Sequence, residues 1–267
     1  MEHDVSFHGQ MSDSFRAAIF IILSGGFQDA YTYCCRGGVF ANAQTGNIVL
    51  LSHSLFSRQW ATALSYLVPL LAFASGILVA ELTRIKLQHT RVLHWRQIIV
   101  LAEILLLFVV GFFPQELNLL ANAFVSFSCA MQVQTFRKVN GYGYASTMCI
   151  GNMRSGTDAF THWLVDHDPK TLKKSLHYFA VILLFAVGAG LGSVAVDHFA
   201  TRTIWWSCLL LAVAFVLMFV KEEIEENPAI EKDLSAIRQE ADEIDALLKE
   251  DLHEEHESWK DTLEHKN

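Results

Sequence analysis

Six long apolar stretches constrain this chain of 267 residues more than any other feature of its sequence. A helix needs about 20 mostly apolar residues to cross the hydrocarbon core of a bilayer. Each stretch comes close to that length, so we predict an all-α polytopic membrane protein with about six transmembrane helices. The stretches cover residues 16–35, 60–83, 98–113, 117–137, 176–197 and 203–221.

The basic residues between these stretches predict the orientation of the chain, since cytoplasmic loops are enriched in Lys and Arg. Four of them separate the second and third stretches, and more follow the fourth stretch and precede the fifth. Both chain termini are therefore expected in the cytoplasm, and two half-apolar segments, 38–53 and 143–163, are expected not to cross. The basic residues are Arg84, Lys86, Arg91, Arg96, Arg137, Lys138, Lys170, Lys173 and Lys174.

An internal repeat appears when the chain is shifted along itself by 105 residues. Gly38 then matches Gly143, and "FASGILVA" (73–80) matches "FAVGAGLG" (185–192) after a seven-residue insertion. Each half, 16–113 and 117–221, would hold three spans and one re-entrant segment. Because three crossings are an odd number, the second half would enter the membrane from the opposite side. Such inverted repeats recur in secondary transporters.

The C-terminal residues differ in composition from the rest. Residues 222–267 contain 17 acids and 5 bases, whereas the preceding 221 residues contain 11 acids and 15 bases. Apolar residues from Ile230 to Leu248 alternate spacings of four and three, as in a coiled-coil seam. We predict a cytoplasmic acidic helix after a short cytoplasmic N-terminal segment (1–15) and the transmembrane domain (16–221). The helix offers a surface for homo-oligomers, and a loosely ordered tail is the alternative.

Polar residues inside the two halves predict a solute-binding site near the bilayer midplane. Ionisable and amide side chains at that depth are costly and more often face a cavity than lipid. Glycine breaks near Gly46 and Gly151 would expose helix N-termini, which bind anions through backbone amides. The candidate site residues are Asp29, Asn42, Thr45, Gly46, Asn47, Gln132, Gln134, Thr147, Gly151, Asn152 and Arg154.

Several of these residues have a structural alternative. In the structural alternative, Asp29 caps a broken helix or pairs with Arg36, two helical turns away. Arg154 is spaced four residues from Asp158 and would neutralise it on one helix face. Glu103 is expected to pair with Arg96 or to lie near the membrane interface. These readings stay open from the sequence alone.

No motif for catalysis or nucleotide binding occurs in the sequence, including GxSxG, HExxH and the P-loop. We therefore expect no enzyme activity, no cofactor and no metal site. The acidic tail argues against binding nucleic acid. The expected partners are the lipid bilayer and a small solute.

Two blocks of sequence resemble a known family. "GGFQDAYTYCCRGGVFANAQTGNIVLL" (25–51) and "SFSCAMQVQTFRKVNGYGYASTMCIGNMRSG" (126–156) are similar to the two signature blocks of the YoaK-like family of uncharacterised bacterial multi-pass membrane proteins. The family commonly has a second TGN where this chain has Ile150-Gly151-Asn152. The resemblance covers about 16–221 and implies a location in the bacterial cytoplasmic membrane.

Together these observations predict a secondary transporter or permease for a small polar or anionic solute. The alternative is a membrane scaffold or regulator that acts through its acidic C-terminal helix.

Overall fold

The computed structural model describes residues 15–87, 95–139, 142–143 and 146–225. The N-terminal segment and the acidic tail, for which we predicted cytoplasmic positions and a helical seam, lie outside these residues. The elements are α1 (Phe15–Cys35), α2 (Gln44–Phe56), α3 (Trp60–Leu87), α4 (Trp95–Val110), η2 (Gln115–Leu117), α5 (Asn118–Thr135), β1 (Lys138–Val139), β2 (Tyr142–Gly143), α6 (Cys149–Asp166), α7 (Pro169–Phe199), η3 (Ala200–Thr203) and α8 (Ile204–Glu225).

The all-α class is confirmed for the described residues, in which the only strands are the antiparallel pair of two-residue strands β1 and β2. Each of the six apolar stretches forms one long helix. The two half-apolar segments form the additional helices α2 and α6. The chain divides into one unit up to Met218 and a second from Phe219.

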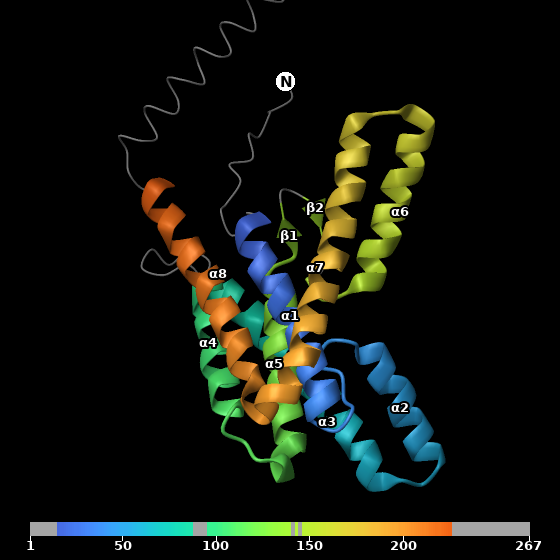
Figure 1. Ribbon diagram of the computed structural model, residues 1–267, viewed down its shortest axis with the longest axis vertical. Coiled ribbons are helices and arrows are strands. Elements are labelled where there is room, and N and C mark those ends of the chain that lie inside the picture. Colours follow the sequence, from blue (N-terminus) through green and yellow to red (C-terminus); the bar gives the residue numbers. More distant parts are fainter. Residues whose placement is uncertain (1–14, 88–94, 140–141, 144–145, 226–267) are drawn as a thin grey trace, which may run out of the picture. The chain divides into compact units, whose positions relative to one another are not determined.

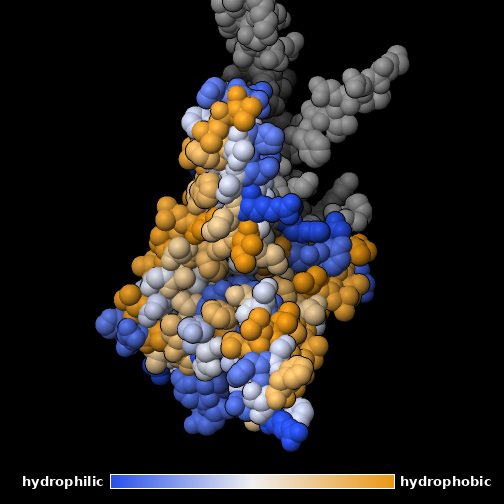
Figure 2. Space-filling model, turned by 90° about the vertical axis from the view of Figure 1, so that its right-hand side faces the viewer, coloured by the Kyte–Doolittle hydropathy of each residue, from blue (hydrophilic) through white to orange (hydrophobic). Residues whose placement is uncertain are grey.

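Two helical stretches of the described residues are long and apolar enough to cross a membrane, Trp60–Leu87 and Pro169–Met218. The first has a row of exposed large apolar side chains at a spacing of seven residues: Leu64, Leu71, Leu78 and Ile85. Figure 2 shows further apolar patches on the outer surface. Apolar rows of this length would be a liability in water but suit contact with lipid.

The long helices pack in pairs that join the two halves of the chain. α1 lies along α7, and α3 lies along α5. Within each half, α2 packs on α3 and α6 packs on α7. In Figure 1, α2 and the start of α3 project at the bottom, whereas α6 and the start of α7 project at the top.

Two glycines allow these helix pairs to approach closely. A methyl group at Gly76 of α3 would overlap the backbone carbonyl of Phe127 on α5. A methyl group at Gly188 of α7 would overlap the carbonyl of Leu23 on α1 in the same way. Each glycine is the first of two small residues four positions apart, Gly76 with Ala80 and Gly188 with Gly192. Such small-xxx-small pairs permit close helix packing in lipid.

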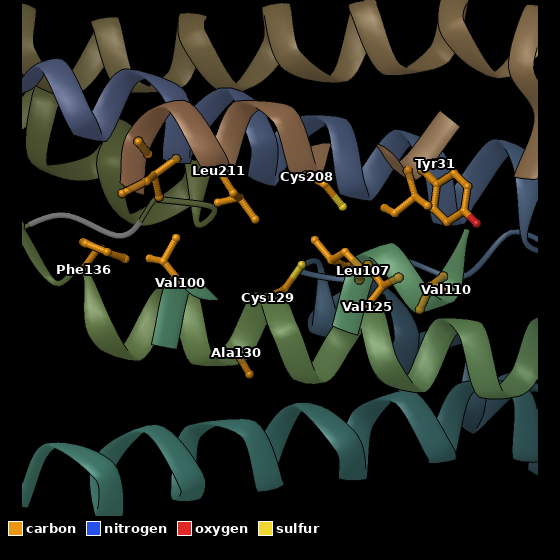
Figure 3. Close-up of a cluster of buried hydrophobic side chains, with 14 of the residues drawn as sticks. Tyr31, Val100, Leu107, Val110, Val125, Cys129, Ala130, Phe136, Cys208 and Leu211 are labelled. Atoms are coloured by element: carbon orange, nitrogen blue, oxygen red, sulfur yellow. The ribbon is translucent and has the colours of Figure 1, made fainter. Parts of the chain in front are cut away.

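The largest apolar core lies between α1, α4, α5 and α8. Figure 3 shows its side chains, which come from all four helices and fill the space between them. Fully buried members include Tyr31, Leu107, Val125 and Leu211. Polar groups border this core on α1 and α5, and they form the candidate site.

Candidate functional site

The segment after α1 folds back along that helix. Gly37 and Gly38 have φ values of 86° and 76°, in the left-handed region that glycine adopts without strain. The chain then returns toward the middle of α1, where the backbone N–H of Asn42 donates to Asp29 Oδ1 at 2.8 Å. Asp29 is buried. Through this hydrogen bond it holds the non-helical segment after α1 against that helix.

Asn47 fixes the start of α2 to this returning segment. Its Oδ1 accepts from the backbone N–H of Phe40 at 3.2 Å, and its Nδ2 donates to the carbonyl of Phe40 at 2.7 Å and to Gln44 Oε1 at 3.0 Å. The side chain is fully buried. All of its amide atoms are therefore engaged within the protein, and we assign Asn47 to positioning the segment.

The second polar segment meets the first at Gly25 on α1. The Cβ position of Gly25 lies 2.5 Å from Thr147 Cγ2 and 3.4 Å from Gln132 Nε2, so there is no room for a side chain there. Asn42 Nδ2 donates to the carbonyl of Gly25 at 3.3 Å. We call Gly25, Asp29, Asn42, Gln132 and Thr147 the Gly25 cluster.

Three oxygen atoms of the Gly25 cluster have no hydrogen-bond partner among the residues that the structure describes. They are Asn42 Oδ1, Gln132 Oε1 and Thr147 Oγ1, and all three are buried. The amide nitrogens of Asn42 and Gln132 are occupied, the latter by the carbonyl of Ile21 at 2.9 Å. Buried polar groups in proteins are nearly always paired. The cluster thus has unused capacity to accept hydrogen bonds or to coordinate a cation.

The remaining predicted residues occupy varied positions. Gln134 lies outside the cluster and donates to Glu81 Oε2 at 2.6 Å. Asn152 is buried at the start of α6, and Gly46 is half-buried. Thr45, Gly151 and Arg154 are exposed and are not part of the Gly25 cluster, so Thr45 is a suitable control position.

Two ion pairs considered from the sequence are not formed. Arg154 and Asp158 are both exposed on α6, and the ion pair found among the described residues is instead that between Glu81 and Arg84. Asp29 does not pair with Arg36; its carboxylate instead accepts the backbone N–H of Asn42. The helix-capping alternative for Asp29 is closer to the observed contact.

The guanidinium of Arg36 is buried and turned toward the end of α4. It donates to the carbonyls of Val110, Phe113 and Pro114 at 3.2, 2.9 and 3.1 Å. These carbonyls follow or end a helix, where backbone acceptors lack partners within it. Arg36 is therefore a structural clamp, and its sequence position beside two glycines gave no sign of these acceptors.

A second buried polar group connects α1, α5 and α8. Gln28 Nε2 donates to Ser24 Oγ at 2.9 Å and to Ser207 Oγ at 3.1 Å, and Cys129 Sγ donates to Gln28 Oε1 at 2.8 Å. None of these four residues is among the candidate site residues predicted from the sequence. In the sequence, a serine or cysteine within an apolar run looks the same whether it joins such a hydrogen-bond network or only packs in the core.

Glu103 on α4 is fully buried, and neither of its carboxyl oxygens accepts a hydrogen bond from a described residue. Arg96 was the expected partner, but its guanidinium carbon lies over the ring of Trp95, 5.4 Å from the ring centroid. The prediction that Arg96 pairs with Glu103 is therefore wrong.

The family described as "Protein of unknown function (DUF1275)" matches residues 17–217, which include every element of the Gly25 cluster. The chain belongs to the DUF1275 family. It is 26% identical over 200 residues to the UPF0700 transmembrane protein YoaK of Bacillus subtilis (strain 168), covering 72% of this chain and 88% of that protein. No solved structure matches the chain. The predicted resemblance to YoaK-like proteins is confirmed.

This DUF1275 protein is thus an integral membrane protein. Its transmembrane relative and its long apolar helices agree on that point. The matched range of the family ends before the acidic tail. Whatever the DUF1275 members share therefore resides in the helical unit that contains the Gly25 cluster.

Proposed function

We propose that this protein is a secondary transporter or permease for a small polar solute, built from six spans in two inverted halves. The observation that carries the proposal is that side chains from both halves, Asn42, Gln132 and Thr147, meet at Gly25 on α1, and each holds a buried oxygen without a partner among the described residues. Non-helical backbone at membrane depth is tolerated where it is buried in protein or lines a wet cavity. A solute would supply the partners that the protein itself does not.

The packing of the helices supports the inverted repeat. Gly76 and Gly188 are equivalent in the repeat, and each contacts the first helix of the other half. Their contacts, Phe127 and Leu23, are 104 residues apart, one less than the repeat shift. Asn42 and Thr147 are 105 residues apart and both reach Gly25. Exchange of equivalent contacts between halves is the pattern expected of a pseudo-two-fold axis.

The composition of the Gly25 cluster favours a solute with hydrogen-bond donors. Its unpartnered atoms are acceptors, and Asp29 adds a carboxylate. An anionic solute would rely on Arg154 and on helix N-termini near Gly46 and Gly151, but Arg154 is exposed. We therefore rank amines, amino acids and polyols above anions as candidate solutes.

Solute uptake into proteoliposomes tests this function, with thermal stabilisation of the purified protein as a second readout. The panel would contain amines, amino acids, polyols and small anions. We expect at least one donor-bearing solute to be taken up, and Gln132→Leu to reduce its uptake at least tenfold. The matched control is Thr45→Val on the exposed side of α2. Absence of uptake and of stabilisation for the whole panel would overturn the proposal.

A chain that ends at Glu225 separates this function from the scaffold alternative. If the membrane unit transports solute, the shortened chain keeps its uptake. If the acidic tail is the functional part, uptake is absent from both chains, and a cellular activity is lost with the tail.

A further inference from the structure

We infer that the Gly25 cluster binds a monovalent cation, with Na⁺ as the best fit to its ligand set; this inference deepens the proposed transport function. The side chains of Asn42, Gln132 and Thr147 meet at Gly25, one turn before the carboxylate of Asp29, and each holds a buried oxygen without a partner among the described residues. These residues come from α1, the returning segment, α5 and the chain just before α6.

The orientation of the amide groups is set by their other contacts. Gln132 Nε2 donates to the carbonyl of Ile21, and Asn42 Nδ2 donates to the carbonyl of Gly25. Exchanging oxygen and nitrogen in either amide would place two acceptors against each other. The free ends are therefore oxygens, which are the atoms that hard cations select.

The charge of the cluster matches one positive charge. Asp29 is its single acid, and one of its oxygens already accepts the N–H of Asn42. Within the described residues, no group of three or more His, Cys, Asp or Glu side chains is placed to hold a metal ion. A divalent ion would leave a surplus charge in a medium of low dielectric constant. A monovalent ion leaves none.

Among the described residues, no side chain supplies the positive charge that would neutralise Asp29. Arg36, the buried base nearest in sequence to this segment, directs its donors to Tyr31, Asn118 and the end of α4. In the part of the chain that the structure describes, no Lys, Arg or His forms an ion pair with Asp29, and the three neutral oxygens of the cluster have no donor. A small cation satisfies the carboxylate and the neutral oxygens at once.

Such a cation would connect both halves of the protein. Asn42 belongs to the returning segment of the first half, whereas Gln132 and Thr147 belong to the second half. Binding would hold both segments to α1, and release would free them. A ligand shifts a conformational equilibrium only through its differential affinity for the two states, and ligands from two moving parts provide it.

The test uses the full-length protein in detergent, without any solute. Its Tm is measured in about 100 mM NaCl, KCl, LiCl or choline chloride, so that ionic strength is constant. We expect Na⁺ to raise the Tm by about 3 °C relative to choline. Thr147→Val and Asp29→Asn should remove that difference, and Thr45→Val should retain it.

Equilibrium dialysis with radioactive Na⁺ provides a direct readout that does not depend on the stability of a variant. The wild type and Thr45→Val should bind Na⁺ alike, and Thr147→Val should bind at least tenfold more weakly. An equal Tm in all four salts, or unchanged Na⁺ binding by Thr147→Val, would overturn the cation site. Because solute is absent, Na⁺ binding without any solute uptake would support the site and reject the transport function.

Discussion

The Nε atom of Arg36 donates to the hydroxyl oxygen of Tyr31 at 2.7 Å, and this bond turns the guanidinium plane toward the end of α4. Arg36→Lys should therefore lower the free energy of unfolding by about 1–3 kcal/mol, since an ammonium group cannot reach these separated acceptors at once and leaves the carbonyl of Phe113 without its donor. Thermal unfolding in detergent measures the effect. Arg58→Lys, at an exposed position between α2 and α3, is the control and should be neutral.

Gly188 and Gly190 on α7 provide a matched pair of substitutions. Gly188→Ala should destabilise the protein by at least about 1–3 kcal/mol, because the new methyl group meets the backbone of Leu23, which cannot move aside as a side chain would. No atom lies within 4 Å of the Cβ position of Gly190, so Gly190→Ala should be neutral or stabilising by up to about 1 kcal/mol. Equal Tm values for the two variants would contradict the close α1–α7 contact.

Asn47→Asp tests how the returning segment is fixed. The substitution keeps the shape of the side chain and the acceptor for the N–H of Phe40, but it removes the donor to the carbonyl of Phe40. It also places an acceptor against Gln44 Oε1. We expect a loss of about 1–3 kcal/mol in stability and reduced protection of the segment in amide hydrogen exchange. Thr45→Ala should leave both unchanged.

Glu103→Gln should leave the Tm unchanged or raise it. The carboxyl group is fully buried, and neither of its oxygens accepts a hydrogen bond from the described residues. A neutral amide of the same shape avoids the cost of an unpaired buried charge. Glu103→Lys, by contrast, should abolish folding. A clear fall in Tm for Glu103→Gln, measured by thermal unfolding, would indicate that the carboxylate has a hydrogen-bond partner outside the described residues.

The sequence predicted the helices well because their signal is local. Six apolar stretches became six long helices, and the polar segments around Gly38 and Gly143 became the interruptions between them. An apolar stretch can be recognised as a helix without knowing which distant residues it will contact. The number of membrane crossings and their inversion stay predictions, since they depend on the bilayer as well as on the chain.

The candidate site was predictable only in part, because its partners are distant or belong to the backbone. Asp29 looked like a partner for Arg36, yet it accepts an N–H from Asn42. Arg36 in turn binds carbonyls more than 70 residues away, which no side-chain pattern encodes. Asn42, Gln132 and Thr147 were identified as site residues, but only the fold brings them to Gly25.

The exchange of helix partners between the halves bears on how the protein is made. α7 begins 134 residues after α1 ends, so α1 enters the membrane long before its packing partner is synthesised. Gln28 on α1 likewise lacks its partners Cys129 on α5 and Ser207 on α8 until those helices are made. The N-terminal half should therefore depend on insertion factors or quality control during translation, and a ribosome stalled before α7 would leave a fragment marked for degradation.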